Sequence, residues 1–118
     1  MILADTSVWV DHFKRADARL SDLLLRTEVL MHPFVIGELA LGGLAARSAR
    51  LLGELPHTAV ASHDEVMLTI ASRGLAGRGI GYVDAHLIAA VLLTSGARLW
   101  TRDARLRTVA EDLDLAVG

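Results

Sequence analysis

The chain has 118 residues, of which 53% are hydrophobic, and its formal net charge at pH 7 is −2. A length of this order is typical of one domain, so we expect residues 1–118 to form a single domain. It contains no cysteine, which excludes disulfides, zinc–thiolate sites and thiol chemistry. The longest unbroken apolar run, Leu87–Leu93, is too short to span a membrane, so a cytoplasmic location is the default expectation. The small net charge leaves the class of partner open.

The N-terminal segment predicts a strand followed directly by a helix. A short apolar run, Ile2–Ala4, stops at Asp5 and is typical of a buried strand. The apolar residues after it have helical spacing, which predicts a helix through Phe13 with Thr6 or Ser7 as its N-cap. Ligands of open α/β sheets bind outside the carboxyl ends of the strands, where Asp5 would stand. The alternative is that Asp5 is only a carboxylate favoured by the helix dipole.

Strands and helices alternate through the rest of the chain. Further strands are predicted at 29–31, 58–62, 98–101 and 115–117, and helices at 17–26, 33–41, 45–55, 63–75, 85–94 and 106–113. This alternation favours βαβ units, and therefore an α/β fold with a parallel sheet of four to five strands. Segment 76–81 holds three glycines and is predicted to be a flexible loop, because it lacks the lysine and spacing of a P-loop.

Four carboxylates stand at positions where chemistry is plausible. Asp5 and Asp103 each follow a predicted strand, Asp84 begins the most apolar helix, and Glu38 lies in an otherwise apolar one. Carboxylates crowded at one site repel by roughly 3 kcal/mol per pair at about 5 Å and an effective dielectric of about 20. A cation would offset this repulsion, and oxygen ligands without thiolates indicate Mg²⁺ or Mn²⁺. Such ions support phosphodiester hydrolysis.

Each acid also has a structural explanation that its spacing leaves open. Glu38 would then form a surface salt bridge with Arg47 or Arg50, Asp84 would cap its helix, and Asp103 would be a turn residue. The five histidines show no metal-ligand spacing, and we expect structural or solvated roles for them.

Four motifs resemble those of PIN-domain ribonucleases, and in particular VapC-type toxins of bacterial toxin–antitoxin pairs. They are Asp5-Thr6-Ser7 with Val8-Trp9, the run Pro33–Leu39 that ends in Glu38-Leu39, the run Gly81–Leu87 with Asp84 at its centre, and Leu99–Asp103. The motifs occur in the family's order and span nearly the whole chain. The resemblance implies a PIN-like domain with strand order 3-2-1-4-5, flanked by helices on both faces, and an endoribonuclease that depends on Mg²⁺, with Mn²⁺ as a substitute.

The same resemblance implies an acidic catalytic site and two kinds of protein partner. Asp5, Glu38, Asp84 and Asp103 would form the site, with Thr6, Ser7 and Thr101 in support. In this scheme Asp5, Asp84 and Asp103 hold the metal, and Glu38 orients a water molecule or acts as base. Arg102, Arg105 and Arg107 are candidates for RNA contacts, with a solvated helix face as the alternative. The chain would form a homodimer, and a small VapB-like antitoxin would hold it inactive. We expect this antitoxin to dock on an apolar groove near Leu39, Leu41, Leu44, Leu51 and Leu52.

Two other functions compete with the nuclease. A phosphoacceptor signalling domain also has a parallel sheet and an acidic metal pocket, but it needs a lysine near the late strands, and Lys14 is the only lysine. A catalytically silent PIN-like binding module would explain the excess of apolar residues. A nuclease assay with and without metal separates this module from an enzyme.

Overall fold

The computed structural model describes residues 1–117, in which short strands are separated by two or more helices. The strands are β1 (Ile2–Ala4), β2 (Val29–Leu30) and β3 (Arg98–Trp100). The helices are α1 (Thr6–Lys14), α2 (Ala18–Leu25), α3 (Pro33–Leu41), α4 (Ala46–Leu52), α5 (His63–Ser72), α6 (Tyr82–Leu93) and α7 (Ala104–Asp112). The predicted α/β class is therefore confirmed.

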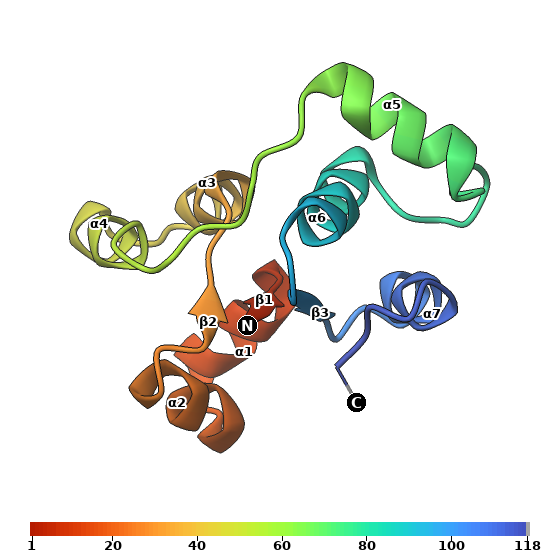
Figure 1. The fold of residues 1–118 in the computed structure, drawn as a ribbon. Coiled ribbons are helices and arrows are strands. Elements are labelled where there is room, and N and C mark those ends of the chain that lie inside the picture. The colour runs from red at the N-terminus through yellow and green to blue at the C-terminus, as the bar shows by residue number, and fades with distance from the viewer. Residues whose placement is uncertain (118) are drawn as a thin grey trace.

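The first strand is the centre of the sheet. All pairings are parallel, and the order is β2-β1-β3. Leu3 pairs with Leu30 on one side and with Leu99 on the other, and all three are buried. Figure 1 shows the sheet between α2 on one side and α3 and α6 on the other. Strands covered in this way carry continuous apolar runs, which is why they were recognisable in the sequence.

The predicted strand at 58–62 is wrong, and the sheet has fewer strands than expected. Only His57, just before this segment, makes a single bridge to the residue that follows β2. The N–H of Ala59 is bound by the hydroxyl of Thr94 at 2.9 Å, so it is not available to a neighbouring strand. Ser62 is already the N-cap of α5, so too few residues remain in this segment to pair further with the sheet.

The predicted strand at 115–117 is also reduced to one bridge, between Ala116 and Leu99. The guanidinium of Arg98 donates to the Ala116 carbonyl at 3.2 and 3.3 Å, so a side chain takes the place of a further strand partner. The two bridges lie at the outer edges of β2 and β3. Their positions correspond to strands 3 and 5 of the implied order 3-2-1-4-5. Each is a single bridged residue pair rather than a strand.

Several helix ends differ from the predictions, and at α1 the difference arises because another residue supplies the cap. Asp5, rather than Thr6 or Ser7, is the N-cap of α1, and its side chain accepts the N–H of Val8. The helix that carries Asp84 begins earlier than predicted, at Tyr82. The helices predicted at 45–55 and 63–75 end earlier, at Leu52 and Ser72.

The predicted apolar helix is confirmed as the most buried one. Every residue from Ala85 to Val91 on α6 is buried, and Figure 1 shows α6 between the sheet and α5. A helix that is apolar on all sides needs this position. Trp9 and Trp100 are also buried, at 1% and 7% exposure, as expected of core residues. None of the helices in residues 1–117 is long and apolar enough to cross a membrane.

Candidate active site

Asp5 is a buried carboxylate at the carboxyl end of the central strand, with 5% of its surface exposed. Its Oδ1 accepts hydrogen bonds from Ser7 Oγ and from the Val8 N–H, and its Oδ2 accepts one from Thr101 Oγ1. Burial raises the pKa of Asp5, and these hydrogen bonds lower it, with burial the larger effect. Asp5 therefore caps α1, which is its structural explanation, and it also stands at the carboxyl end of the central strand.

The hydroxyl of Thr101 joins Asp5 to the segment after β3. Thr101 is 4% exposed, and its Oγ1 accepts the Asp103 N–H at 3.0 Å while donating to Asp5. The carboxylate of Asp103 in turn caps α7 by accepting the Leu106 N–H at 2.9 Å. Ser7 makes a parallel link, because its Oγ accepts the Arg102 N–H at 3.0 Å. These hydroxyls connect Asp5 to the segment that carries Asp103.

Asp84 lies on the first turn of α6, within electrostatic reach of two other acids. Its Oδ2 accepts the Gly81 N–H at 3.0 Å, so the predicted capping role is present. Burial raises the pKa of Asp84, and the charges of Asp5 and Asp103 raise it further, against the lowering effect of the Gly81 hydrogen bond. The structure thus brings together three of the four predicted acids in one electrostatic environment.

Glu38 is joined to the same site through Thr6. The hydroxyl of Thr6, next to Asp5 in the chain, donates to Glu38 Oε1 at 2.6 Å. The alternative salt bridge is not formed, since neither Arg47 nor Arg50 pairs with Glu38 in the described part of the chain.

The donor set suits a hydrated divalent cation. Within residues 1–117, no three Asp, Glu, His or Cys side chains lie close enough together to form a metal-binding group. The groups that converge are carboxylate and hydroxyl oxygens, the ligands that Mg²⁺ prefers, and Mg²⁺ often binds through one or two carboxylates while keeping several waters. The charges of Asp5 and Asp103 disfavour the ionised form of Asp84, and a cation bound beside Asp84 would offset that repulsion.

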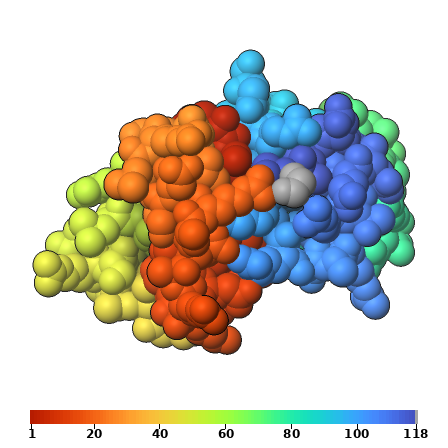
Figure 2. Space-filling model, turned by 90° about the horizontal axis from the view of Figure 1, so that it is seen from below, coloured from red at the N-terminus to blue at the C-terminus, as the bar shows by residue number. Residues whose placement is uncertain are grey.

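The three arginines after β3 differ in what they contact. Arg102 forms ion pairs with Asp11 at 3.0 Å and with Asp17 at 2.7 Å. These pairs connect the turn after β3 to the N-terminal helices, and Figure 2 shows these parts of the chain abutting on one face. Arg107 pairs with Glu111 at 3.5 Å along α7. No such pair is formed by Arg105 within residues 1–117.

The loop before α6 was predicted only to be flexible, but it contacts both Asp84 and Arg105. Gly81 donates its N–H to Asp84, and Gly79, with φ of +79°, packs directly against Arg105. A glycine three residues before an acid at a helix start has the spacing of a capping interaction, and this signal was available in the sequence.

A groove of about 370 Å³ opens beside Glu38. Its walls come from the C-terminal half of α1 and from the end of α3 with the loop after it, and its charged groups are Glu38 and Lys14. Its apolar lining includes Val10, Phe13 and Leu44. Leu41, at 91% exposure, stands on the same helix as Glu38. Of the residues predicted to form the apolar groove, Leu39 and Leu44 line it, whereas Leu41, Leu51 and Leu52 do not.

Two comparisons with known proteins agree with this geometry. The family model described as PIN domain matches residues 2–112. Ribonuclease VapC32 of Mycobacterium tuberculosis, from strains CDC 1551 / Oshkosh and ATCC 25618 / H37Rv, is 49% identical over 120 residues, covering 100% of this chain and 97% of the relative. The parallel sheet with carboxylates at its carboxyl edge is consistent with a PIN domain, and the match over residues 2–112 shows that the chain belongs to the PIN-domain family. Within that family it is of the VapC type.

Proposed function

We propose that this protein is a divalent-cation-dependent endoribonuclease and the toxin of a type II toxin–antitoxin module. The observation that supports the proposal is the position of Asp5 at the carboxyl end of the central strand, with Asp84 near enough to Asp5 and Asp103 for their charges to raise its pKa. The similar full-length protein from M. tuberculosis carries the name ribonuclease, which supports RNA as the substrate. A cytoplasmic location is part of the proposal, because RNA is present there.

The proposed reaction is hydrolysis of an RNA phosphodiester by water. Mg²⁺ or Mn²⁺, when bound, supplies an activated water at neutral pH and neutralises charge on the transferring phosphate. Asp5, Asp84 and Asp103 are the residues that would hold the cation. Glu38 Oε1 is fixed by the Thr6 hydroxyl, which leaves the second carboxylate oxygen to orient the attacking water and accept its proton. Ser7 and Thr101 keep Asp5 in one orientation by donating to its two oxygens.

A direct assay separates the enzyme from a catalytically silent module. Total RNA is incubated with the purified protein in Mg²⁺, in Mn²⁺ and in EDTA, and new ends are mapped by sequencing. We expect discrete new ends with either cation and none with EDTA. A protein that binds RNA but yields no new ends with either cation is the silent module.

The role of Glu38 is tested by Glu38→Gln. Glutamine keeps an oxygen to accept the Thr6 hydroxyl but cannot take a proton, so kcat should fall by about 10²–10⁴ while the fold is kept. Glu54→Gln, an exposed substitution of the same type, should cleave like wild type. Wild-type cleavage by Glu38→Gln would remove Glu38 from the chemistry.

The groove beside Glu38 is the proposed docking site for a VapB-like antitoxin. Its apolar lining suits an amphipathic helix, and a basic side chain on the partner would pair with Glu38 and so block the acidic site. Phe13→Asp should weaken the complex with an antitoxin encoded next to this gene. Leu25→Asp, at an 87% exposed position on α2, should not. If both variants co-purify with the antitoxin like wild type, this groove is not the docking site.

A homodimer is the second proposed assembly. Apolar side chains are exposed away from the groove, including Met67 at 49% and Leu68 at 68% on α5. Light scattering should give the mass of a dimer for wild type, and Leu68→Asp should shift it toward the monomer. A monomeric wild type would contradict the proposal.

A further inference from the structure

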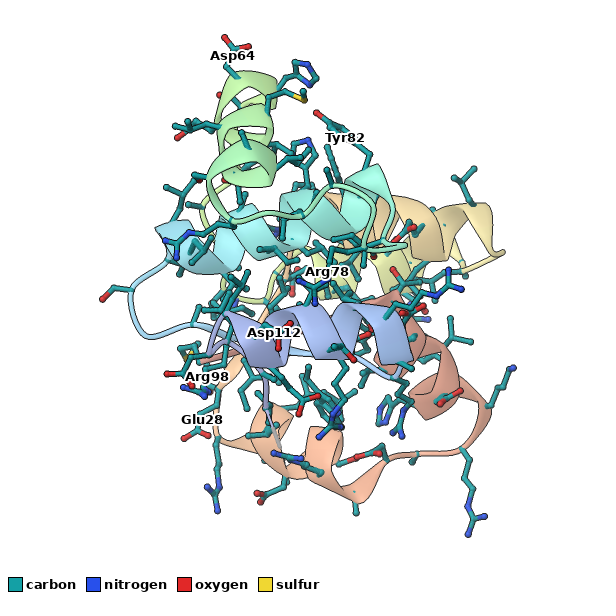
Figure 3. All side chains as sticks on the ribbon, turned by 90° about the vertical axis from the view of Figure 1, so that its right-hand side faces the viewer. Glu28, Asp64, Arg78, Tyr82, Arg98 and Asp112 are labelled. Carbon is teal, nitrogen blue, oxygen red and sulfur yellow. The ribbon has the colours of Figure 1, made fainter. Side chains whose placement is uncertain are left out.

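Arg105 is exposed and forms no ion pair within residues 1–117, in contrast to the arginines near it. Its guanidinium makes no hydrogen bond or ion pair with the described residues 1–117. Arg102 is bound by two aspartates, Arg107 by Glu111, and Arg78 by Asp112 at 2.6 Å. Figure 3 shows Arg78 and Asp112 next to each other on the α7 side of the molecule. An anion can therefore bind Arg105 without first breaking an ion pair.

Gly79 leaves the space in which the Arg105 side chain packs against the loop. A Cβ at position 79 would lie 2.8 Å from Arg105 Cδ, 2.9 Å from Nη1 and 3.3 Å from Nε. Only a residue without a side chain lets the arginine approach the loop this closely. The left-handed φ of +79° at Gly79 also favours glycine. The Arg105 side chain thus packs directly against the loop, and no charged group within residues 1–117 pairs with its guanidinium there.

This position is beside the acidic site. The loop that touches Arg105 through Gly79 also binds Asp84 through the Gly81 N–H, and Arg105 follows Asp103 by two residues. Arg105 also lines a pocket of about 250 Å³ with Arg78, Ala104 and Thr108. The pocket lies between the loop and the first half of α7, and it is roomy enough for a phosphate group.

We propose that Arg105, which packs against Gly79, binds a backbone phosphate of the RNA next to the acidic site. This inference rests on the proposed ribonuclease function. The acidic site repels the phosphates of an approaching RNA, and a guanidinium at the edge of the site offsets that repulsion. Arginine suits the task because its planar guanidinium can make two hydrogen bonds to one phosphate.

The first test is the salt dependence of RNA binding. A fluorescein-labelled single-stranded RNA is bound in EDTA, without cleavage, over a range of NaCl concentrations. The slope of log K against log[NaCl] is negative, and losing one phosphate contact should make it less steep by about 0.7. Arg105→Gln should therefore bind RNA more weakly and with this less steep slope. Arg47→Gln removes the same charge from an exposed arginine on α4, which Figures 1 and 2 place at the opposite end of the molecule from α7. It should keep the wild-type slope.

The second test moves Arg105 without removing its charge. Gly79→Ala puts a methyl group into the side chain of Arg105, whereas Gly77→Ala, at a similar φ of +74°, meets nothing within 4 Å. Both variants share the backbone strain, but only Gly79→Ala should weaken RNA binding and raise KM. In a protein that already carries Arg105→Gln, Gly79→Ala should weaken RNA binding no further. A merely structural role for Gly79 predicts equal losses with and without Arg105.

The outcomes separate this inference from the proposed function. If wild type cleaves RNA and Arg105→Gln keeps the wild-type slope, the phosphate contact is refuted and the nuclease stands. Equal effects of Gly79→Ala and Gly77→Ala on binding would refute the positioning by Gly79. If wild type neither binds nor cleaves RNA, the proposed function fails, and the role of Arg105 fails with it.

Discussion

Replacing Asp84 with asparagine should change the stability of the metal-free and metal-bound protein in opposite directions. Burial raises the pKa of Asp84, and the charges of Asp5 and Asp103 add to this effect, which means that the folded state disfavours its ionised form. Asp84→Asn removes this unfavourable charge. The asparagine side-chain oxygen can still accept the Gly81 N–H, which is bound at 3.0 Å in the wild type. Without metal the variant should therefore melt at or above the wild-type temperature.

The response to metal should be smaller in the variant. A ligand that binds only the folded state at a hundredfold excess over its dissociation constant stabilises that state by about 2.7 kcal/mol. For a chain of this length, that corresponds to a rise of roughly 10 °C in the melting temperature. Asp84→Asn deletes one of the proposed ligands, so most of this rise should disappear.

Thermal melts in EDTA and in millimolar Mn²⁺ measure both effects. The matched control is Asp64→Asn, because Asp64 is also an acid in the first turn of a helix, α5, but is exposed. The control should show the full metal response of wild type. An Asp84→Asn protein that gains as much stability from Mn²⁺ as wild type would show that Asp84 only caps α6 and does not hold the cation.

Two further substitutions test the surroundings of the site. Thr101→Val leaves Asp5 without one donor and the Asp103 N–H without its acceptor, so unfolding free energy should fall by about 1–3 kcal/mol, measured by urea denaturation. Thr69→Val on the exposed face of α5 is the control and should cost far less. Burial and nearby His86 lower the pKa of His32 from 6.5 to about 4, so the unfolded chain takes up the proton first. Above pH 6.5, His32 is neutral in both states and its contribution to the free energy of unfolding is fully present. As the pH falls to 4, the free energy of unfolding should decrease by about 3 kcal/mol. His32→Asn, which can still cap α3, should lack this part of the pH dependence; an unchanged pH profile would refute the assignment.

The centre of the fold could be predicted because its sequence signals are local. Ile2–Ala4 is short, apolar and ended by Asp5, and α6 is apolar on every side, so burial determined both elements. The positions of Asp5 and Asp103 followed from the strands that precede them. Helix starts were harder to predict, because Asp5, Thr6 and Ser7 are all good N-cap residues. The cap of α1 was decided by contacts of the folded protein, in which hydroxyl groups hold the Asp5 side chain.

The edges of the sheet and the contacts of the arginines could not be predicted. Whether 58–62 extends the sheet depends on Thr94, a residue distant in the sequence, which binds the N–H of Ala59. The three arginines after β3 look alike in the sequence. They differ because Asp11 and Asp17 lie near Arg102 only after folding, while Arg105 lies against Gly79.

The most direct test of the proposed function is RNA cleavage by Asp5→Asn in Mg²⁺. Asparagine keeps an oxygen that can cap α1, so circular dichroism should show a folded protein. Asp17→Asn is the control, since Asp17 is likewise an N-cap, of α2, and accepts the Leu20 N–H. We predict that Asp5→Asn cleaves at least about a hundredfold more slowly than wild type, as expected when one preorganised electrostatic interaction is removed, and that Asp17→Asn stays close to wild type. A folded Asp5→Asn protein that cleaves RNA at the wild-type rate would contradict the account.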